Sequence, residues 1–94
     1  MQVTQISRCE ALSGYCNIFT IDGQKYLSTK SIKDYEDILP DDIFYRIHNS
    51  HLINLNCIKK YYKGRGGFIE MDDGVLIEVA SRRKDEFLAR FGHK

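Results

Sequence analysis

A short polar run in the middle of the chain, residues 48–51, carries side chains well suited to recognition chemistry. It reads His-Asn-Ser-His and follows an alternating, strand-like segment over residues 44–48, with Leu52 and Ile53 after it. Asn and Ser side chains bond nearby backbone groups, so the run could be a plain turn between two strands. The same types recognise nucleic acid, because an Asn amide pairs with adenine, a Ser hydroxyl bonds phosphate or base, and a cation such as Arg46 attracts phosphate. Residue type alone leaves both interpretations open.

A second candidate segment lies near the end of the sequence, where Ser81 precedes three consecutive cations, Arg82, Arg83 and Lys84. Ser81 has the place of a helix N-cap, which would put the cations in the first turn of a closing helix. The helix dipole disfavours positive charge there by roughly a few tenths of a kcal/mol per exposed residue. A bound anion would relieve this conflict, since free N–H groups and guanidinium groups would converge on it. The alternative is an ordinary solvated basic surface.

An enzyme or zinc site is one rival interpretation, because His48, His51 and Cys57 are close in sequence. The two histidines are three residues apart across an expected turn, and the cysteine lies six residues further on. Strand geometry opposes a compact site at this spacing, and four convincing zinc ligands are missing. We therefore predict no enzyme activity, no metal site and no cofactor.

A protein-interaction or dimerisation module that does not bind nucleic acid is the other rival. Exposed strand edges and the adjacent Tyr61 and Tyr62 would supply its surface. This alternative predicts a weak dependence on salt. Nucleic-acid binding predicts a steep one, because neutralised phosphates release counterions.

The composition describes a small globular protein whose basic residues are concentrated in the second half. The 94 residues are 43% apolar and 29% charged, which predicts one folded domain over residues 1–94. Residues 1–43 hold four Lys/Arg against seven Asp/Glu, and residues 44–94 hold ten against six. The formal net charge of +1 therefore hides a basic surplus around both candidate segments, which favours a polyanionic partner.

The chain shows no signal for a membrane or a secretory pathway. No apolar run approaches the roughly 18 residues of a membrane span, and no basic-then-apolar leader is present. Its three cysteines, Cys9, Cys16 and Cys57, are odd in number and irregularly spaced, which argues against a disulfide framework. We expect a cytoplasmic protein without membrane contact, with the cysteines buried as small hydrophobic residues.

Alternation and turn signals predict a chain made mostly of strands. The expected strands cover residues 2–12, 15–21, 24–27, 44–48, 52–62, 68–71 and 75–79. Asp22-Gly23 should form a type I′ hairpin turn. A helix with Thr29 as its N-cap should follow and end at Pro40. A short helix from Ser81 should close the chain, with Phe87, Leu88 and Phe91 facing inward and Gly92 at its end.

Several of these segments together resemble the LytTR family of DNA-binding domains, which typically form the C-terminal output half of bacterial response regulators. They are the run FYRIHNSHLIN over residues 44–54, Ile58, the Asp73-Gly74 pair, and the run VASRR over residues 79–83. The match covers nearly the whole chain, and its central motif is specific. One departure is His51, where the family usually has an aromatic residue.

The resemblance implies a mostly β fold of stacked small antiparallel sheets built from hairpins. One short helix would follow the first hairpin, and the C-terminus would be helical. It also implies that loops, rather than a recognition helix, enter successive major grooves of double-stranded DNA. The chain would then be a transcriptional regulator that binds repeated half-sites together with a second copy of itself. Control by phosphorylation could come only from a receiver or sensor domain upstream of this sequence, or not at all.

The resemblance further assigns contacts by matching position. Base contacts fall to Asn49 in the central motif, to Arg83 at the helix start, and to Tyr15 and Asn17 in the first turn region, residues 13–17. The first turn matches by pattern and not by motif. The residues assigned to phosphates are Arg46, His48, Ser50, Arg82 and Lys84.

Overall fold

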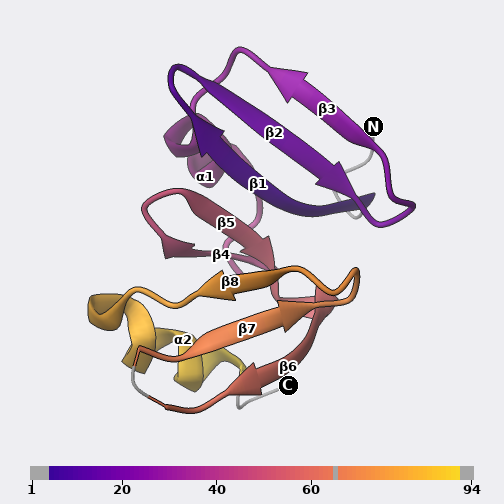
Figure 1. Cartoon of the computed structure of the whole chain (residues 1–94). Coiled ribbons are helices and arrows are strands. Elements are labelled where there is room, and N and C mark those ends of the chain that lie inside the picture. Colours follow the sequence, from indigo (N-terminus) through magenta and orange to yellow (C-terminus); the bar gives the residue numbers. More distant parts are fainter. Residues whose placement is uncertain (1–4, 65, 92–94) are drawn as a thin grey trace.

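Two antiparallel β-sheets dominate the computed structural model, which describes residues 5–64 and 66–91 (Figure 1). The larger sheet has the strand order β3-β2-β1-β5-β4, and the smaller has the order β6-β7-β8. The strands are β1 (Ile6–Leu12), β2 (Tyr15–Thr20), β3 (Lys25–Ser28), β4 (Phe44–His48), β5 (His51–Asn54), β6 (Ile58–Tyr62), β7 (Phe68–Met71) and β8 (Leu76–Glu78). The expected mostly β fold of stacked small sheets is confirmed.

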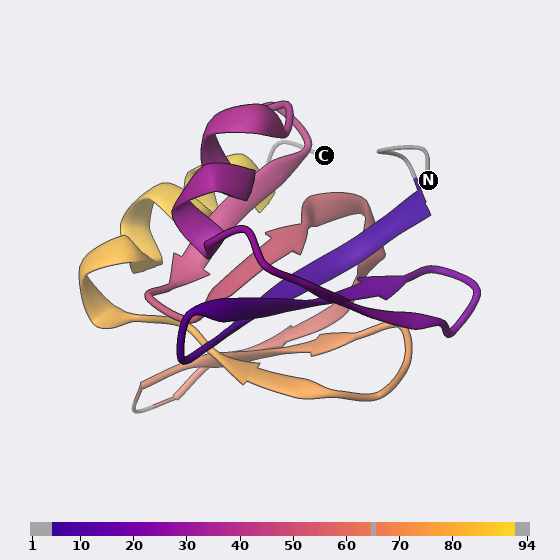
Figure 2. The same cartoon turned by 90° about the horizontal axis from the view of Figure 1, so that it is seen from above.

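Two short α-helices accompany the sheets, and Figure 2 shows both on the same side of them. Helix α1 (Ile32–Ile38) follows the β2–β3 hairpin, and α2 (Lys84–Phe91) closes the described chain. Ser31, not Thr29, caps α1. Its hydroxyl accepts from the Asp34 N–H at 3.1 Å, and the Asp34 carboxylate accepts from the Ser31 N–H at 3.1 Å. This reciprocal capping box explains why the Thr29 prediction was wrong. No helix in the described part of the chain is long and apolar enough to cross a membrane.

Strands β4 and β5 lie between two apolar cores, because successive side chains of a strand point to opposite faces. Phe44 and Leu52 pack into the core under α1, where Cys9 and Cys16 are also buried. On the opposite face, the second core joins the larger sheet to the smaller sheet and to α2. Its members from these elements include Tyr45, Ile47, Ile53, Ile69, Ile77 and Phe87. The central hairpin is therefore fixed from both sides.

Asn54 ends β5 and turns the chain toward the second sheet. Its side chain is buried, donates from Nδ2 to the Ile6 carbonyl at 3.0 Å, and accepts from the Asn56 N–H at 2.8 Å. The second bond caps the short 3₁₀ helix η2 (Leu55–Cys57). The single strand expected over residues 52–62 is therefore interrupted, so that β5 and β6 lie in different sheets.

The β2–β3 turn also differs from its prediction. A type I′ turn needs positive φ at both Asp22 and Gly23, but only Gly23 has it, at +89°. The Thr20 N–H bonds the Gln24 carbonyl at 3.0 Å, and the Gly23 N–H bonds the Thr20 carbonyl at 3.1 Å. The connection is therefore one residue longer than expected, although the hairpin itself is present.

Candidate nucleic-acid interface

Three polar segments lie along one edge of the molecule, at the left in Figure 1. They are the β1–β2 turn at residues 13–14, the β4–β5 turn at residues 49–50, and the 3₁₀ helix η3 (Ser81–Arg83) that leads into α2. Figure 2 places them on the same side when the molecule is seen from above. We call this set of three segments the turn edge. It brings together residues that are far apart in the sequence.

Hydrogen bonds join the central turn to the chain on both sides of it. The Ala11 N–H donates to the Ser50 carbonyl at 2.8 Å, which ties the β4–β5 turn to β1. On the other side, Arg82 Nη2 donates to Asn49 Oδ1 at 2.8 Å. The Ala80 N–H also donates to the Ile47 carbonyl at 3.0 Å. The three segments of the turn edge are therefore held in a fixed relation.

Asn49 is the exposed tip of the central turn. Its side-chain oxygen accepts from Arg82, and this hydrogen bond does not use its Nδ2 donors. Its backbone carbonyl accepts from Arg46 Nη2 at 2.7 Å. Both the main chain and the amide of this predicted base-reading residue are thus oriented by arginines.

Arg46 is used within the protein. Its Nη1 donates to Glu36 Oε1 on α1 at 3.0 Å, and its side chain is only 17% exposed. With Nη2 bound to the Asn49 carbonyl, both terminal nitrogens have internal acceptors. Its contact with a DNA phosphate stays a prediction. Sequence reasoning missed Glu36, because no local pattern marks a partner ten residues away in a different element.

His48 and Ser50 stabilise the same turn locally. The Ser50 N–H donates to His48 Nδ1 at 3.1 Å, so this ring nitrogen acts as the acceptor. His48 Nε2 lies 3.9 Å from Glu78 Oε1 on β8. The Ser50 hydroxyl and the partly exposed His48 ring remain near the surface of the turn.

His51 pairs with His48 across the hairpin, with the ring centroids 5.5 Å apart. Burial lowers the pKa of His51 below its ordinary value of 6.5, opposed by the charge of Glu10. Cys57, the third member of the rival metal or thiol site, is instead buried in the second core. Across residues 5–64 and 66–91, no three His, Cys, Asp or Glu side chains form a group suited to a metal ion.

Only Lys84 of the cationic segment begins the α-helix, whereas the sequence had suggested that all three cations lie in its first turn. Arg82 and Arg83 lie in η3, which follows Ala80, and α2 starts at Lys84 with Asp85 and Glu86 in its first turn. Ser81 is therefore not the N-cap, and the acidic residues satisfy the helix dipole. The conflict that pointed to an anion is weaker than predicted. Arg82 and Arg83 lie on the turn edge because the chain forms a 3₁₀ turn over the three residues before α2.

A fully buried aromatic anchors this cationic segment. Phe87 packs its ring against Tyr45, Tyr61 and Phe91, with centroids 5.5 to 6.3 Å apart. The Tyr45 hydroxyl donates to the Arg83 carbonyl at 3.1 Å. Leu88, which was expected to face inward, is 37% exposed, since Phe87 and Phe91 already fill the inward face at helical spacing. The expected end at Gly92 lies outside the described residues.

The first turn presents two residues on one face of β2. Tyr15 is 47% exposed, and Asn17 is partly buried with its Nδ2 directed at Glu10 Oε1, 3.4 Å away. Cys16 and Ile18 alternate with them and point into the core under α1. Tyr15 and Asn17 therefore point away from that core, beside the β1–β2 turn. Their assignment to DNA bases stays a prediction.

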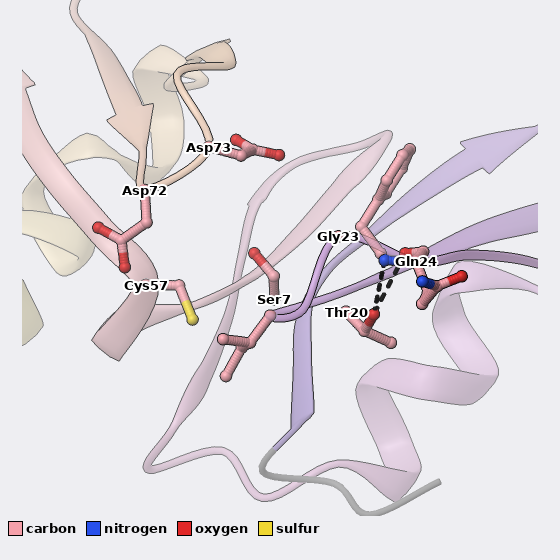
Figure 3. Close-up of a pocket in the computed structure, with 9 residues that line it drawn as sticks. Ser7, Thr20, Gly23, Gln24, Cys57, Asp72 and Asp73 are labelled. Atoms are coloured by element: carbon pink, nitrogen blue, oxygen red, sulfur yellow. Dashed lines mark hydrogen bonds between the residues drawn. The ribbon is translucent and has the colours of Figure 1, made fainter.

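Two of the hollows in the described part of the chain can be compared with the turn edge. A crevice of about 220 Å³ is lined by residues of α1, β4, η3 and α2, among them Glu36, Arg46 and Arg83. A smaller cavity of about 90 Å³ lies at the opposite end, between the β2–β3 and β7–β8 turns (Figure 3). Asp72 and Asp73 line it, and two carboxylates disfavour a polyanion. The smaller cavity is therefore separate from the turn edge.

Comparison with known proteins identifies this arrangement. The family model of the LytTr DNA-binding domain matches residues 1–92. A similar solved structure is the LytTr DNA-binding domain of a Bacillus cereus protein described as a methyl-accepting/DNA response regulator. It has a TM-score of 0.86 and 23% sequence identity, and the match covers 98% of this chain and 85% of that chain. The comparison with curated proteins finds no match.

Proposed function

The chain belongs to the LytTR family of DNA-binding domains, and from this premise we propose that its turn edge binds double-stranded DNA sequence-specifically. The observation that carries the proposal is the convergence of three polar segments on one edge, with Asn49 and Arg82 joined at 2.8 Å. Turns and a 3₁₀ helix present these side chains. We therefore propose that loops, rather than a long recognition helix, enter successive major grooves.

Base reading falls to the residues whose side chains offer directional hydrogen bonds on the turn edge. Asn49 would bond adenine, and Arg83 would bond guanine, because these side chains match the donor and acceptor pattern of those bases in the major groove. Tyr15 and Asn17 would read the base pairs in front of the first turn. Each of these residues is assigned to a base because of its position along this edge of the molecule.

Phosphate binding falls to the flanking groups. Arg82 is exposed and Lys84 is partly exposed, so both can reach the backbone while remaining attached to the turn edge. The Ser50 hydroxyl and the outer side of His48 would add neutral hydrogen bonds. Such contacts fix the register of the protein on the DNA duplex and supply most of the salt-dependent affinity.

At the level of the cell, the proposed role is a non-enzymatic regulator of transcription. The similar Bacillus cereus protein is described as a response regulator, which supports a signal-dependent output role for this chain. We propose one domain over residues 1–94 that binds repeated half-sites as two copies in the cytoplasm. Half-sites about one helical turn apart, or roughly 10 base pairs, would place two copies on the same DNA face.

Selection from a random duplex pool tests the proposal. The domain is titrated by fluorescence anisotropy at several salt concentrations, and the retained DNA is sequenced. Asn49→Ala is the test variant. Lys25→Ala is the matched control, because this exposed residue begins β3, next to the β2–β3 turn at the far end of the sheet.

We expect a salt-dependent affinity, an enriched repeated motif, and a loss of enrichment in Asn49→Ala but not in Lys25→Ala. Salt-dependent binding without enrichment would reduce the chain to a general polyanion binder. An absence of binding at low salt would overturn the proposal in favour of a protein partner.

A further inference from the structure

We propose that Glu36 and Arg46 are positioning residues that hold the β4–β5 turn in the conformation that reads DNA. The inference rests on the DNA-binding function proposed above and deepens it. It assigns a recognition role to Glu36, a carboxylate on α1 that would itself repel DNA. It also gives Arg46 a role that differs from a phosphate contact.

A continuous polar chain connects α1 to the turn edge. Glu36 Oε1 accepts from Arg46 Nη1 at 3.0 Å, and Arg46 Nη2 donates to the Asn49 carbonyl at 2.7 Å. Asn49 Oδ1 in turn accepts from Arg82 Nη2 at 2.8 Å. Four residues from α1, β4, the central turn and η3 are thereby linked, with Asn49 taking part through both its main-chain carbonyl and its side chain.

The geometry suits positioning better than direct binding. A guanidinium presents its donors in a rigid planar fork, so fixing Nη1 on Glu36 also fixes the direction of Nη2 toward Asn49. The Arg46 side chain is only 17% exposed, which restricts its access to a phosphate. A lysine cannot reproduce the fork, because its ammonium is a single point charge.

The ion pair, rather than tight packing, confines the Arg46 head group. The crevice of about 220 Å³ between α1, β4, η3 and α2 is lined by both Arg46 and Glu36. This space would admit other rotamers of the arginine. Arg46 Nε is also buried without a hydrogen-bond partner among the described residues, so it does not hold the side chain. Removing Glu36 would therefore release the guanidinium from the Asn49 carbonyl.

Positioning and phosphate binding predict different losses. A phosphate contact contributes to every DNA sequence alike, and its removal lowers the salt slope by about one. A positioning residue acts through Asn49, so its removal lowers the preference for the selected site over scrambled DNA and leaves the salt slope unchanged. The two roles are thus separated by one titration series on two duplexes.

The test compares Glu36→Ala, Glu36→Gln, Arg46→Lys and the charge-removing Arg46→Ala with the wild-type domain. Asp37→Asn is the matched control, because this neighbouring carboxylate on α1 pairs with Lys33 at 3.7 Å and lies outside the polar chain. Binding is measured on the selected duplex and on a scrambled duplex across a salt series. Amide NMR spectra of the free domain report directly on residues 49 and 50, and thermal unfolding checks the fold.

We expect Glu36→Ala to reduce the selected-to-scrambled ratio by roughly tenfold, the size of one lost base contact. Glu36→Gln should lose less, since its amide oxygen still accepts, and Arg46→Lys should lose as much as Glu36→Ala. The salt slope should stay within experimental error of wild type in the Glu36 variants. The amide signals of residues 49 and 50 should shift in these variants and not in Asp37→Asn. A double variant Glu36→Ala/Arg46→Lys should lose no more than either single variant.

Equal losses on both duplexes in Arg46→Ala with a slope lowered by about one, together with full specificity in Glu36→Ala, would overturn the inference and make Arg46 a phosphate contact. Unshifted turn amides with full specificity in Glu36→Ala would overturn it as well. Failure of the wild-type domain to prefer any duplex is a different result, because it rejects the DNA-binding proposal itself.

Discussion

The salt dependence of DNA binding should correspond to two or three neutralised phosphates, because the turn edge offers few available cations. Arg82 and Lys84 are the cations proposed to reach phosphates, and Arg83 adds a third if its charge also displaces counterions. Arg46 is engaged by Glu36 and by the Asn49 carbonyl. Two to three neutralised phosphates correspond to a slope of log K against log salt of about −2 to −3.

The perturbation that isolates one of these charges is Lys84→Ala. Lys84 is the first residue of α2, and its stem passes close to Gly67 on the opposite loop. Removing it should reduce the magnitude of the slope by about 0.9, with the same loss on selected and scrambled DNA. Lys25→Ala removes an equal charge away from the turn edge and should leave the slope unchanged.

The assay is a fluorescence-anisotropy titration at four or more salt concentrations, at constant pH and with one anion. A wild-type slope steeper than about −4 would show that further cations of the basic second half contact DNA, and the reasoning would fail. An unchanged slope in Lys84→Ala would remove this residue from the interface. A lowered slope in Lys25→Ala would mean that the DNA wraps beyond the turn edge.

Further expectations concern base reading, the anchor of α2, protonation and the buried thiols. Arg83→Ala should cost roughly 1–3 kcal/mol and relax specificity at one position of the site, as measured on a panel of single-base variants, and an equal loss on all of them would make it a phosphate contact. Phe87→Ala should lower the free energy of unfolding by about 3–5 kcal/mol in urea titrations, whereas Leu88→Ala, at 37% exposure, should cost about 1 kcal/mol or less. Because burial lowers the pKa of His51 in the folded state, the unfolded chain takes up its proton first. Stability should therefore decline as pH falls below 6.5, and the His51→Gln variant should show a smaller decline in urea titrations across that range. Burial raises the pKa of Cys9 to about 12, so iodoacetamide should modify this thiol only after denaturation, as mass spectrometry would show.

Local sequence patterns placed the strands more accurately than the helix caps. Period-two alternation placed most strands within a few residues, since each strand buries one face or both against a core. The predicted Thr29 cap failed because the competing Ser31–Asp34 capping box satisfies two N–H groups where Thr29 was expected to satisfy one. The Ser81 cap failed because the chain enters α2 through a 3₁₀ turn after Ala80.

Some features of the candidate site could be predicted from the sequence, and others could not. The sequence by itself determined the mostly β fold, the family, and the two polar segments around Asn49 and Arg83, because residue type and spacing carry those signals. Only the tertiary structure decided how these segments meet. The Asn49–Arg82 bond and the clamp of Glu36 on Arg46 join elements whose separation along the chain is fixed by sheet pairing and by the burial of Phe87. Such contacts depend on the packing of whole elements, and no local pattern records the partner of a side chain across space.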